Sequence, residues 1–139
     1  MDVERLKQQS ETRQVKLVFK NTVNDHNTLF GGSALQWMDE VAYITATRFC
    51  RKKVVTISAD TIQFLKPIQY GAICELVGKI GEVGKLKLKI NVEIFAEQKY
   101  SIEREKAVEG VFTFAAIDEN SKPVKLFDDT EYMLACSEK

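Results

Sequence analysis

The sequence predicts an α+β fold in which one long central helix is wrapped by a curved antiparallel sheet of about five strands. Residues 33–50 form the most apolar segment of helical length, with no proline or glycine inside it. The later segments with strand character follow one another and are joined by short turns, which implies antiparallel pairing. A helix of about 18 residues would be about 27 Å long, so a sheet that curls around it would bury most of it.

Local patterns place the individual elements. Residues 14–20 and 85–94 alternate apolar and polar side chains, as a strand with one buried face does. Residues 53–64 are rich in β-branched side chains, turn signals in 66–71 end that strand, and 118–123 breaks the last one. In chain order we expect a strand over 14–20, a polar loop over 21–28, the helix over 33–50, strands over 53–64, 72–83, 85–94 and 107–117, and a short helix over 127–139.

Length, charge and cysteine content limit the classes of protein. The 139 residues fit one domain, which we place at 1–139. Lys and Arg number 20, as do Asp and Glu, and this balance argues against a nucleic-acid partner and favours self-association. The charged N-terminal segment lacks the apolar region of a secretory signal, and no apolar run could cross a bilayer, so we expect a cytoplasmic protein with no membrane partner. Cys50, Cys74 and Cys136 are widely spaced, which favours buried free thiols in a reducing compartment.

One acid in the predicted helix lies where an acid is not expected. On a helical wheel that starts at Leu35, Asp39 falls at about 40°, at the edge of the apolar stripe, whereas Glu40 falls at about 140°, in the polar sector. A buried carboxylate must be paired, hydrogen-bonded or protonated. Asp39 therefore has two interpretations. It is either a structural residue bonded to a hydroxyl or amide, or a catalytic acid or base.

The helix is preceded by Gly31 and Gly32. Glycines at a helix start allow close approach of the backbone, and the free amides there can polarise a carbonyl or hold an anion. A tight turn between loop and helix is the alternative interpretation. Together, the amides and Asp39 provide what hydrolysis of an acyl group needs, an oxyanion site and a group that activates water or attacks.

The spacing of these parts predicts a shared site. Gly32 and Asp39 are about 10 Å apart along the helix axis, so one thioester carbon is not expected to touch both from a single helix. In a two-fold dimer, the amides of one subunit could face the acid of the other. Other chemistry is less favoured. His26 is the only histidine and has no partner at metal-ligand spacing, so we expect no metal, and neither a serine-hydrolase nor a dinucleotide-binding motif is present. Asp60, in the strand after the helix, is compatible with a structural or a functional role.

Two blocks of residues resemble the hotdog-fold acyl-CoA thioesterases, and most closely their cytosolic acyl-CoA hydrolase branch. The first is NDHNTLFGGSALQWMDEVA, from Asn24 to Ala42, and the second is VVTISADTIQFLKPIQYG, from Val54 to Gly71. The resemblance covers roughly residues 14–117. It implies a helix wrapped by an antiparallel sheet, two subunits joined edge to edge, and often three dimers in a hexamer. It also implies hydrolysis of acyl-CoA to fatty acid and CoA, with no cofactor, since CoA is part of the substrate.

The resemblance assigns roles residue by residue. Asp39 matches the family's general base or nucleophile, and Gly32 matches the helix-start glycine whose amide binds the thioester oxygen. Asn24 matches the asparagine that opens the motif, although some relatives have a catalytic asparagine nearer the glycines, where this chain has Thr28. The remaining residues placed near bound substrate by analogy are Gly31, Thr28, Thr56, Ser58 and Lys66.

Two rival functions share this fold. A sensing module would bind acyl-CoA without cleaving it, but the retained Asp39 and the lack of a DNA-binding domain argue against it. A dehydratase usually has a histidine at its site, and His26 falls in a loop. The predicted function is therefore an acyl-CoA thioester hydrolase with Asp39-assisted attack of water.

Overall fold

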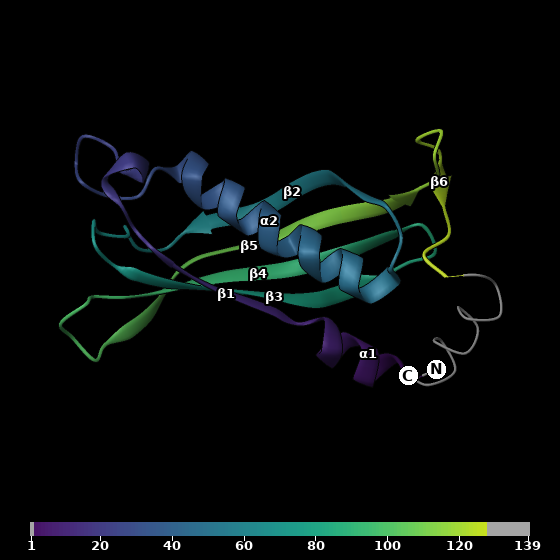
Figure 1. Ribbon diagram of the computed structural model, residues 1–139, viewed down its shortest axis with the longest axis horizontal. Coiled ribbons are helices and arrows are strands. Elements are labelled where there is room, and N and C mark those ends of the chain that lie inside the picture. Colours follow the sequence, from purple (N-terminus) through teal and green to yellow (C-terminus); the bar gives the residue numbers. More distant parts are fainter. Residues whose placement is uncertain (1, 128–139) are drawn as a thin grey trace.

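The computed structural model describes residues 2–127 and has the predicted α+β architecture, with one long helix lying across a curved sheet (Figure 1). A short helix, α1, precedes the first strand, and a single 3₁₀ turn over Lys20–Thr22 follows it. The elements are α1 (Val3–Ser10), β1 (Thr12–Leu17), α2 (Gly31–Cys50), β2 (Val54–Phe64), β3 (Ile73–Val83), β4 (Lys87–Glu97), β5 (Arg104–Ile117) and β6 (Pro123–Val124).

The sheet is antiparallel throughout, in the order β1-β3-β4-β5-β2, with the two-residue β6 paired to the end of β5. Consecutive strands β3, β4 and β5 are hairpin neighbours, as the short turns predicted. β2 follows the helix and pairs only with β5 among the described strands, so an 11-residue strand forms one edge of the sheet. Two of the predicted site residues, Thr56 and Ser58, belong to this open edge strand.

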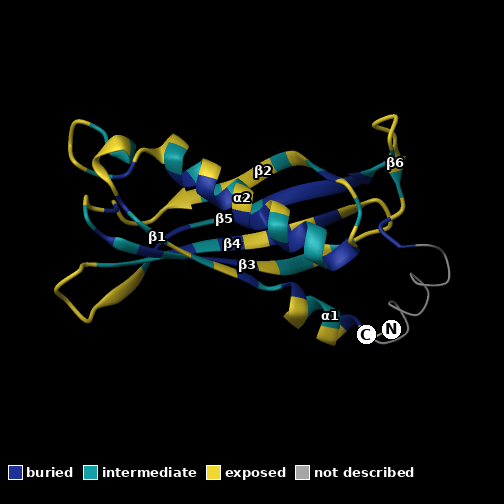
Figure 2. Ribbon diagram, in the orientation of Figure 1, coloured by how far each residue is buried: buried dark blue, intermediate teal, exposed yellow. Residues whose placement is uncertain are grey.

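The core lies between α2 and the concave face of the sheet, where buried residues of both layers meet (Figure 2). Strand β4 alternates as predicted, with Leu88, Ile90, Val92 and Ile94 buried beneath the helix. On the helix, Trp37 is buried together with Met38 and Ala42, and the ammonium of Lys16 on β1 lies over its ring, 5.4 Å from the ring centre. The curled sheet therefore encloses more of the helix than one flat layer would.

Gly78 of β3 sets how closely α2 approaches the sheet. A Cβ at this position would lie 2.5 Å from the Thr45 hydroxyl oxygen and 2.8 Å from a methyl carbon of Val41. Both side chains are fully buried, and the Thr45 hydroxyl is held by a 2.8 Å hydrogen bond to the carbonyl of Val41. The helix therefore rests on bare backbone at Gly78.

Strand β2 contains an irregularity close to its exposed end. The register with β5 shifts between Asp60 and Gln63, and Thr61 has φ 51°, a left-handed conformation that β-branched residues rarely adopt. Opposite this bulge is Gly110, where a Cβ would collide with the side chain of Ile62. Gly110 thus makes room for the bulge, which locally bends and twists the edge strand.

The element boundaries differ from the predicted ones where a cap or turn decides them. Helix α2 begins at Gly31, two residues earlier than predicted, because the amide of Ala34 already bonds to the carbonyl of Phe30. Helix α1 was not predicted; Asp2 caps it by accepting a 3.1 Å hydrogen bond from the amide of Arg5. The predicted first strand, 14–20, is found at 12–17 because its last residue enters the 3₁₀ turn.

The later boundaries shift by two or three residues. β4 runs from 87 to 97 where 85–94 was predicted, and β5 begins at 104 where 107 was predicted, because the hairpin between them stays paired to the register Glu97–Arg104. Strand β6 was not predicted. Of the helix predicted over 127–139, all but Phe127 lies outside the described residues.

Substitution of Gly78 by alanine is expected to lower the free energy of unfolding by about 1–3 kcal/mol, because overpacking forces the helix away from the sheet. Chemical denaturation gives the value. Gly32→Ala is the matched control, since a Cβ there meets nothing within 4 Å. If Gly78→Ala were as stable as the parent protein, the close helix–sheet contact would not constrain the fold.

Candidate active site

The structure gives Asp39 a specific partner at the edge of the subunit. The Thr56 hydroxyl of β2 donates a 2.8 Å hydrogen bond to Oδ1 of Asp39. The side chain of Asp39 is half-buried, as its position at the edge of the apolar stripe predicted, whereas Glu40 is exposed and bonds to Gln36 at 3.3 Å. Because β2 is the edge strand, this carboxylate lies at the margin of the sheet and not in the core.

The start of α2 presents unpaired amides. The first amides of a helix have no partner within it, and Phe30, the residue before α2, makes no side-chain cap. Gly31 and Gly32 are both exposed, and the space around Gly32 is open. A Cβ at Gly31 would touch the ring of Phe64 at 3.4 Å, so Phe64 flanks the helix start. Sequence analysis did not identify Phe64, which belongs to a strand that is far away in sequence.

Asn24 organises the loop that leads into the helix. Its Oδ1 accepts hydrogen bonds from the amides of His26 at 2.9 Å and Thr28 at 3.1 Å, and its Nδ2 donates to the Thr28 hydroxyl at 2.9 Å. Asn24 and Thr28, both predicted site residues, are therefore direct partners. Their bonds hold the loop in a compact turn beside the helix start.

A hollow of about 250 Å³ lies next to the helix start and includes two of the predicted substrate-binding residues, Thr28 and Lys66. Its walls are mainly apolar, and Lys66 also forms a 3.5 Å ion pair with Glu105 at the surface. The full lining is Thr28, Leu29, Ala34, Phe64, Lys66, Pro67, Ile68 and Val108.

The predicted residues thus fall into two groups within one subunit. Gly31, Gly32, Thr28 and Lys66 gather around the start of α2, with Asn24 behind them. Asp39 and Thr56 lie about two helical turns further along. Ser58 and Asp60 bond to each other at 3.1 Å on β2.

A second hollow, of about 370 Å³, adjoins the carboxylate and is lined by Gln14, Asp39, Glu40, Tyr43 and Ile44. The Oε1 atom of Gln14 is buried and has no hydrogen-bond partner within residues 2–127. Sequence analysis had included Gln14 only as the first residue of a predicted strand. Its position opposite the helix could be known only once β1 was placed beside α2.

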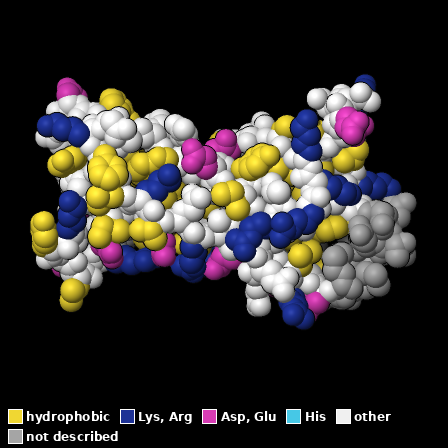
Figure 3. Space-filling model, in the orientation of Figure 1, with side chains coloured by type: hydrophobic (Ala, Val, Ile, Leu, Met, Phe, Trp, Pro, Cys, Tyr) yellow, Lys and Arg dark blue, Asp and Glu magenta, His cyan; other side chains and the backbone are white. Residues whose placement is uncertain are grey.

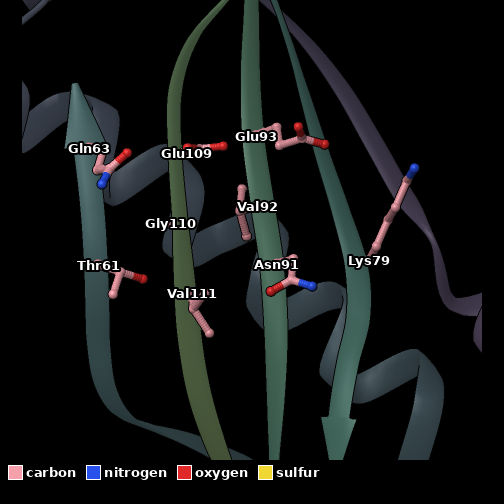
Figure 4. Close-up of a pocket in the computed structure, with 9 residues that line it drawn as sticks. All are labelled: Thr61, Gln63, Lys79, Asn91, Val92, Glu93, Glu109, Gly110 and Val111. Atoms are coloured by element: carbon pink, nitrogen blue, oxygen red, sulfur yellow. The ribbon is translucent and has the colours of Figure 1, made fainter. Parts of the chain in front are cut away.

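The hollow on the other face of the sheet, of about 430 Å³, does not share any residue with the predicted site (Figure 4). Its two acids, Glu93 and Glu109, are paired with Lys106 at 3.3 and 2.8 Å, and these bonds raise the pKa of Lys106. Both carboxylates are thus engaged in ion pairs with Lys106, and Lys79 in the lining pairs with Glu11 at 3.8 Å.

Burial disfavours the thiolate form of both described cysteines. Cys50 and Cys74 are free and buried, as predicted, and burial raises the pKa of the Cys74 thiol to about 11. The third predicted thiol, Cys136, lies outside the described residues. No group of His, Cys, Asp and Glu side chains within 2–127 could hold a metal ion, and no helix among those residues is long and apolar enough to cross a membrane.

Comparison with known proteins identifies the family. The model of the thioesterase superfamily matches residues 26–103. The chain is 39% identical over 117 residues to an acyl-CoA thioester hydrolase of Bacillus subtilis, itself uncharacterized, covering 84% of this chain and 67% of that protein. The chain therefore belongs to the thioesterase superfamily, and the predicted hotdog fold and enzyme class are confirmed.

Two solved structures are informative about the site and the assembly. An acyl-CoA hydrolase of Staphylococcus aureus, solved with butyryl coenzyme A, has 30% identity and a TM-score of 0.82, covering 94% of this chain and 83% of that one. Asparagine, aspartate and threonine variants of it, each changed to alanine, have also been solved. A hexameric thioesterase of Yersinia pestis has 28% identity and a TM-score of 0.75, covering 81% of this chain and 91% of that one.

Removing the Asn24 side chain should loosen the loop before α2. In Asn24→Ala, the amides of His26 and Thr28 lose their acceptor, and we expect their hydrogen exchange to quicken by about fivefold, in line with about 1 kcal/mol per hydrogen bond. Asn24→Asp keeps the acceptor oxygen and is expected to retain most of the protection. Equal protection in the parent and Asn24→Ala would contradict the structural role of this side chain.

Proposed function

We propose that this protein hydrolyses acyl-CoA thioesters to a free fatty acid and CoA. The Asp39 carboxylate activates water, and the amide of Gly32 stabilises the oxyanion. The observation that carries the proposal is the 2.8 Å bond from Thr56 to Asp39, which holds a carboxylate at the sheet edge in a chain of the thioesterase superfamily. A cytoplasmic location and the lack of a cofactor stay predictions.

The spacing of three residues supports this assignment. In the S. aureus hydrolase, the asparagine, aspartate and threonine that were changed to alanine are 15 and 17 positions apart. Asn24, Asp39 and Thr56 have the same order and the same two separations here. Of these residues, Asp39 and Thr56 touch, and Asn24 shapes the loop before the glycines.

The proposed reaction follows from these groups. Asp39 accepts a proton from water as the water oxygen bonds to the thioester carbonyl carbon. The carbonyl oxygen becomes an oxyanion, to which the Gly32 amide donates a hydrogen bond. When the carbonyl reforms, the carbon–sulfur bond breaks and CoA leaves as a thiolate. That thiolate takes up the proton that Asp39 accepted from water, which restores the carboxylate. The Thr56 hydroxyl keeps the carboxylate oriented throughout.

The proposed active unit is a dimer joined through β2. An exposed 11-residue edge strand is a template for pairing with another chain, and Ile57, Phe64 and Leu65 add exposed apolar surface on and just beyond it. Antiparallel pairing of β2 with its two-fold copy would bring the Asp39 margin of one subunit toward the other subunit. The group at the helix start and the group at Asp39 would then meet across the dimer. We further propose that three such dimers form a hexamer, as the Y. pestis relative is hexameric.

A panel of acyl-CoA substrates of increasing chain length, with detection of the released thiol, tests the function directly. Turnover of at least one substrate is expected, and its dependence on chain length defines the preference. Tight binding of acyl-CoA without thiol release would contradict the proposal and indicate a sensing module.

Asp39→Asn should lower turnover by about 10²–10⁴-fold, the usual contribution of a general base, while leaving the fold intact. Glu40→Gln is the matched control; it removes a neighbouring exposed carboxylate and should change turnover little. Steady-state thiol release gives both values, and circular dichroism checks folding. An active Asp39 variant beside an inactive Glu40 variant would reverse the assignment.

The shared site predicts that two inactive variants complement each other. Gly32→Pro deletes the proposed oxyanion amide and Asp39→Asn deletes the base, so a mixed dimer carries one site with both groups intact. Random pairing makes about half of the dimers mixed, each with one working site of two, so about a quarter of the parent activity is the ceiling. Co-expression with two affinity tags isolates assemblies that contain both variants, and cross-linking through β2 verifies which dimers are mixed. Verified mixed dimers that stay inactive would place the site within one subunit or assign the oxyanion to another donor.

A further inference from the structure

The hairpin between β4 and β5 ends in apolar side chains that nothing covers. In this hairpin tip, residues 98–103, Tyr100 is 98% exposed and Ile102 is 101% exposed. The next most exposed large apolar side chain among the described residues, Val15, is at 66%. The tip extends beyond the rest of the sheet (green, lower left in Figure 1). Full exposure of two large apolar groups on one turn is unfavourable in water and is typical of an interaction site.

Hydrogen bonds define the turn at the tip, and further contacts hold its base against the sheet. The Ser101 amide bonds to the carbonyl of Gln98 at 3.2 Å, and the Ser101 hydroxyl accepts from the amide of Glu103 at 3.1 Å. At the base, Arg104 donates a 2.6 Å hydrogen bond to Glu75 and lies over the Phe95 ring at 4.4 Å. The hydrogen bond from Arg104 lowers the pKa of Glu75, and both contacts of Arg104 fix the hairpin to the sheet. Tyr100 and Ile102 are thus presented from a defined turn.

A hollow of about 400 Å³ lies beside the tip, between it and the turn after β2. The exposed side chain of Tyr70 forms one wall of this hollow. The exposed Phe19 lies at the same end of the molecule, because the amide of Gly71 donates a hydrogen bond to the carbonyl of Val18, the residue before Phe19. Hydrophobic side chains gather at this end of the molecule in Figure 3. The lining is Tyr70, Gly71, Gln98, Lys99, Tyr100 and Ser101.

Of the other exposed apolar groups in the described chain, Val15 of β1 borders the hairpin base beside Phe95 and Arg104, and the rest have different surroundings. Those on and beyond β2, with Phe30 and Tyr43 of α2 and its entry, lie around the proposed dimer edge and site. Leu86 lies alone in the turn between β3 and β4, at the far end of those strands. The hairpin tip and its hollow therefore form a separate surface that the two-fold β2 contact does not use.

We infer that this surface is the contact between dimers, its partner being a second copy of this chain. The inference rests on the proposed function, in which three β2-linked dimers form a hexamer. A two-fold contact uses the same surface on both subunits and ends at a dimer, so a hexamer needs a second contact, which is either another two-fold contact or a head-to-tail contact that closes around a three-fold axis. A protruding tip beside a hollow of its own suits a head-to-tail contact: Tyr100 and Ile102 of one subunit pack into the hollow walled by Tyr70 of the next.

The test is the mass of the assembly, measured by light scattering on a sizing column, for the double variant Tyr100→Ser/Ile102→Ser. The parent protein should have the mass of six chains and the double variant the mass of two, with thioesterase activity per subunit within about threefold of the parent. Tyr70→Ser, which alters the hollow alone, should dissociate the hexamer in the same way. Leu86→Ser is the matched control and should stay hexameric.

The outcomes separate the two proposals. A double variant that remains hexameric, or falls to single chains, overturns the inference, as does a parent protein that is itself a dimer. A hexameric Tyr70→Ser variant shows that the tip does not enter this hollow and overturns the head-to-tail contact. If the parent releases no thiol from any acyl-CoA, the proposed function fails, whereas the mass measurements still decide the contact.

Discussion

The close packing of α2 against the sheet is the constraint on which the rest of the structure depends. At Gly78 the helix side chains Val41 and Thr45 pack directly against strand backbone. The helix can come this close to the sheet because Gly78 has no side chain. The small buried residues Ala42 and Ala46 continue this close contact along the helix. Both proposed catalytic groups are carried by this one rigid element, the amides at its first turn and the carboxylate at Asp39.

The same packing explains why the site lies at a margin. The side of the helix that faces the curved sheet carries apolar side chains. Polar and charged groups are therefore found at the ends of the helix and at the border of its buried face. Asp39 occupies the edge nearest β2, where a hydroxyl from the outermost strand can reach it. The chemistry is thus placed where a second subunit can supply the other half and where substrate can enter between two surfaces.

The helix, the main strands along the chain and the position of Asp39 could be predicted from the sequence because each rests on local periodicity. Asp39 was separated from Glu40 by about 100° of helical rotation alone, and its half-buried position agrees with that prediction. Capping geometry was less accessible: α1 depends on a side-chain cap at Asp2, and the start of α2 on a backbone bond at Phe30. Gln14 and Phe64 were missed because they reach the site region from strands distant in sequence. Strand order, which brings them there, is a property of the whole fold.

The bulge at Thr61 in β2 has a consequence for solubility. A long, regular edge strand with apolar side chains could recruit further chains without limit, as cross-β aggregates do. The β2–β5 ladder shifts register between Thr56 and Ser58, and again between Asp60 and Gln63, where the left-handed Thr61 lies opposite Gly110. The edge keeps enough regular backbone to hold one copy in one register, while its bent end cannot act as a template for the next.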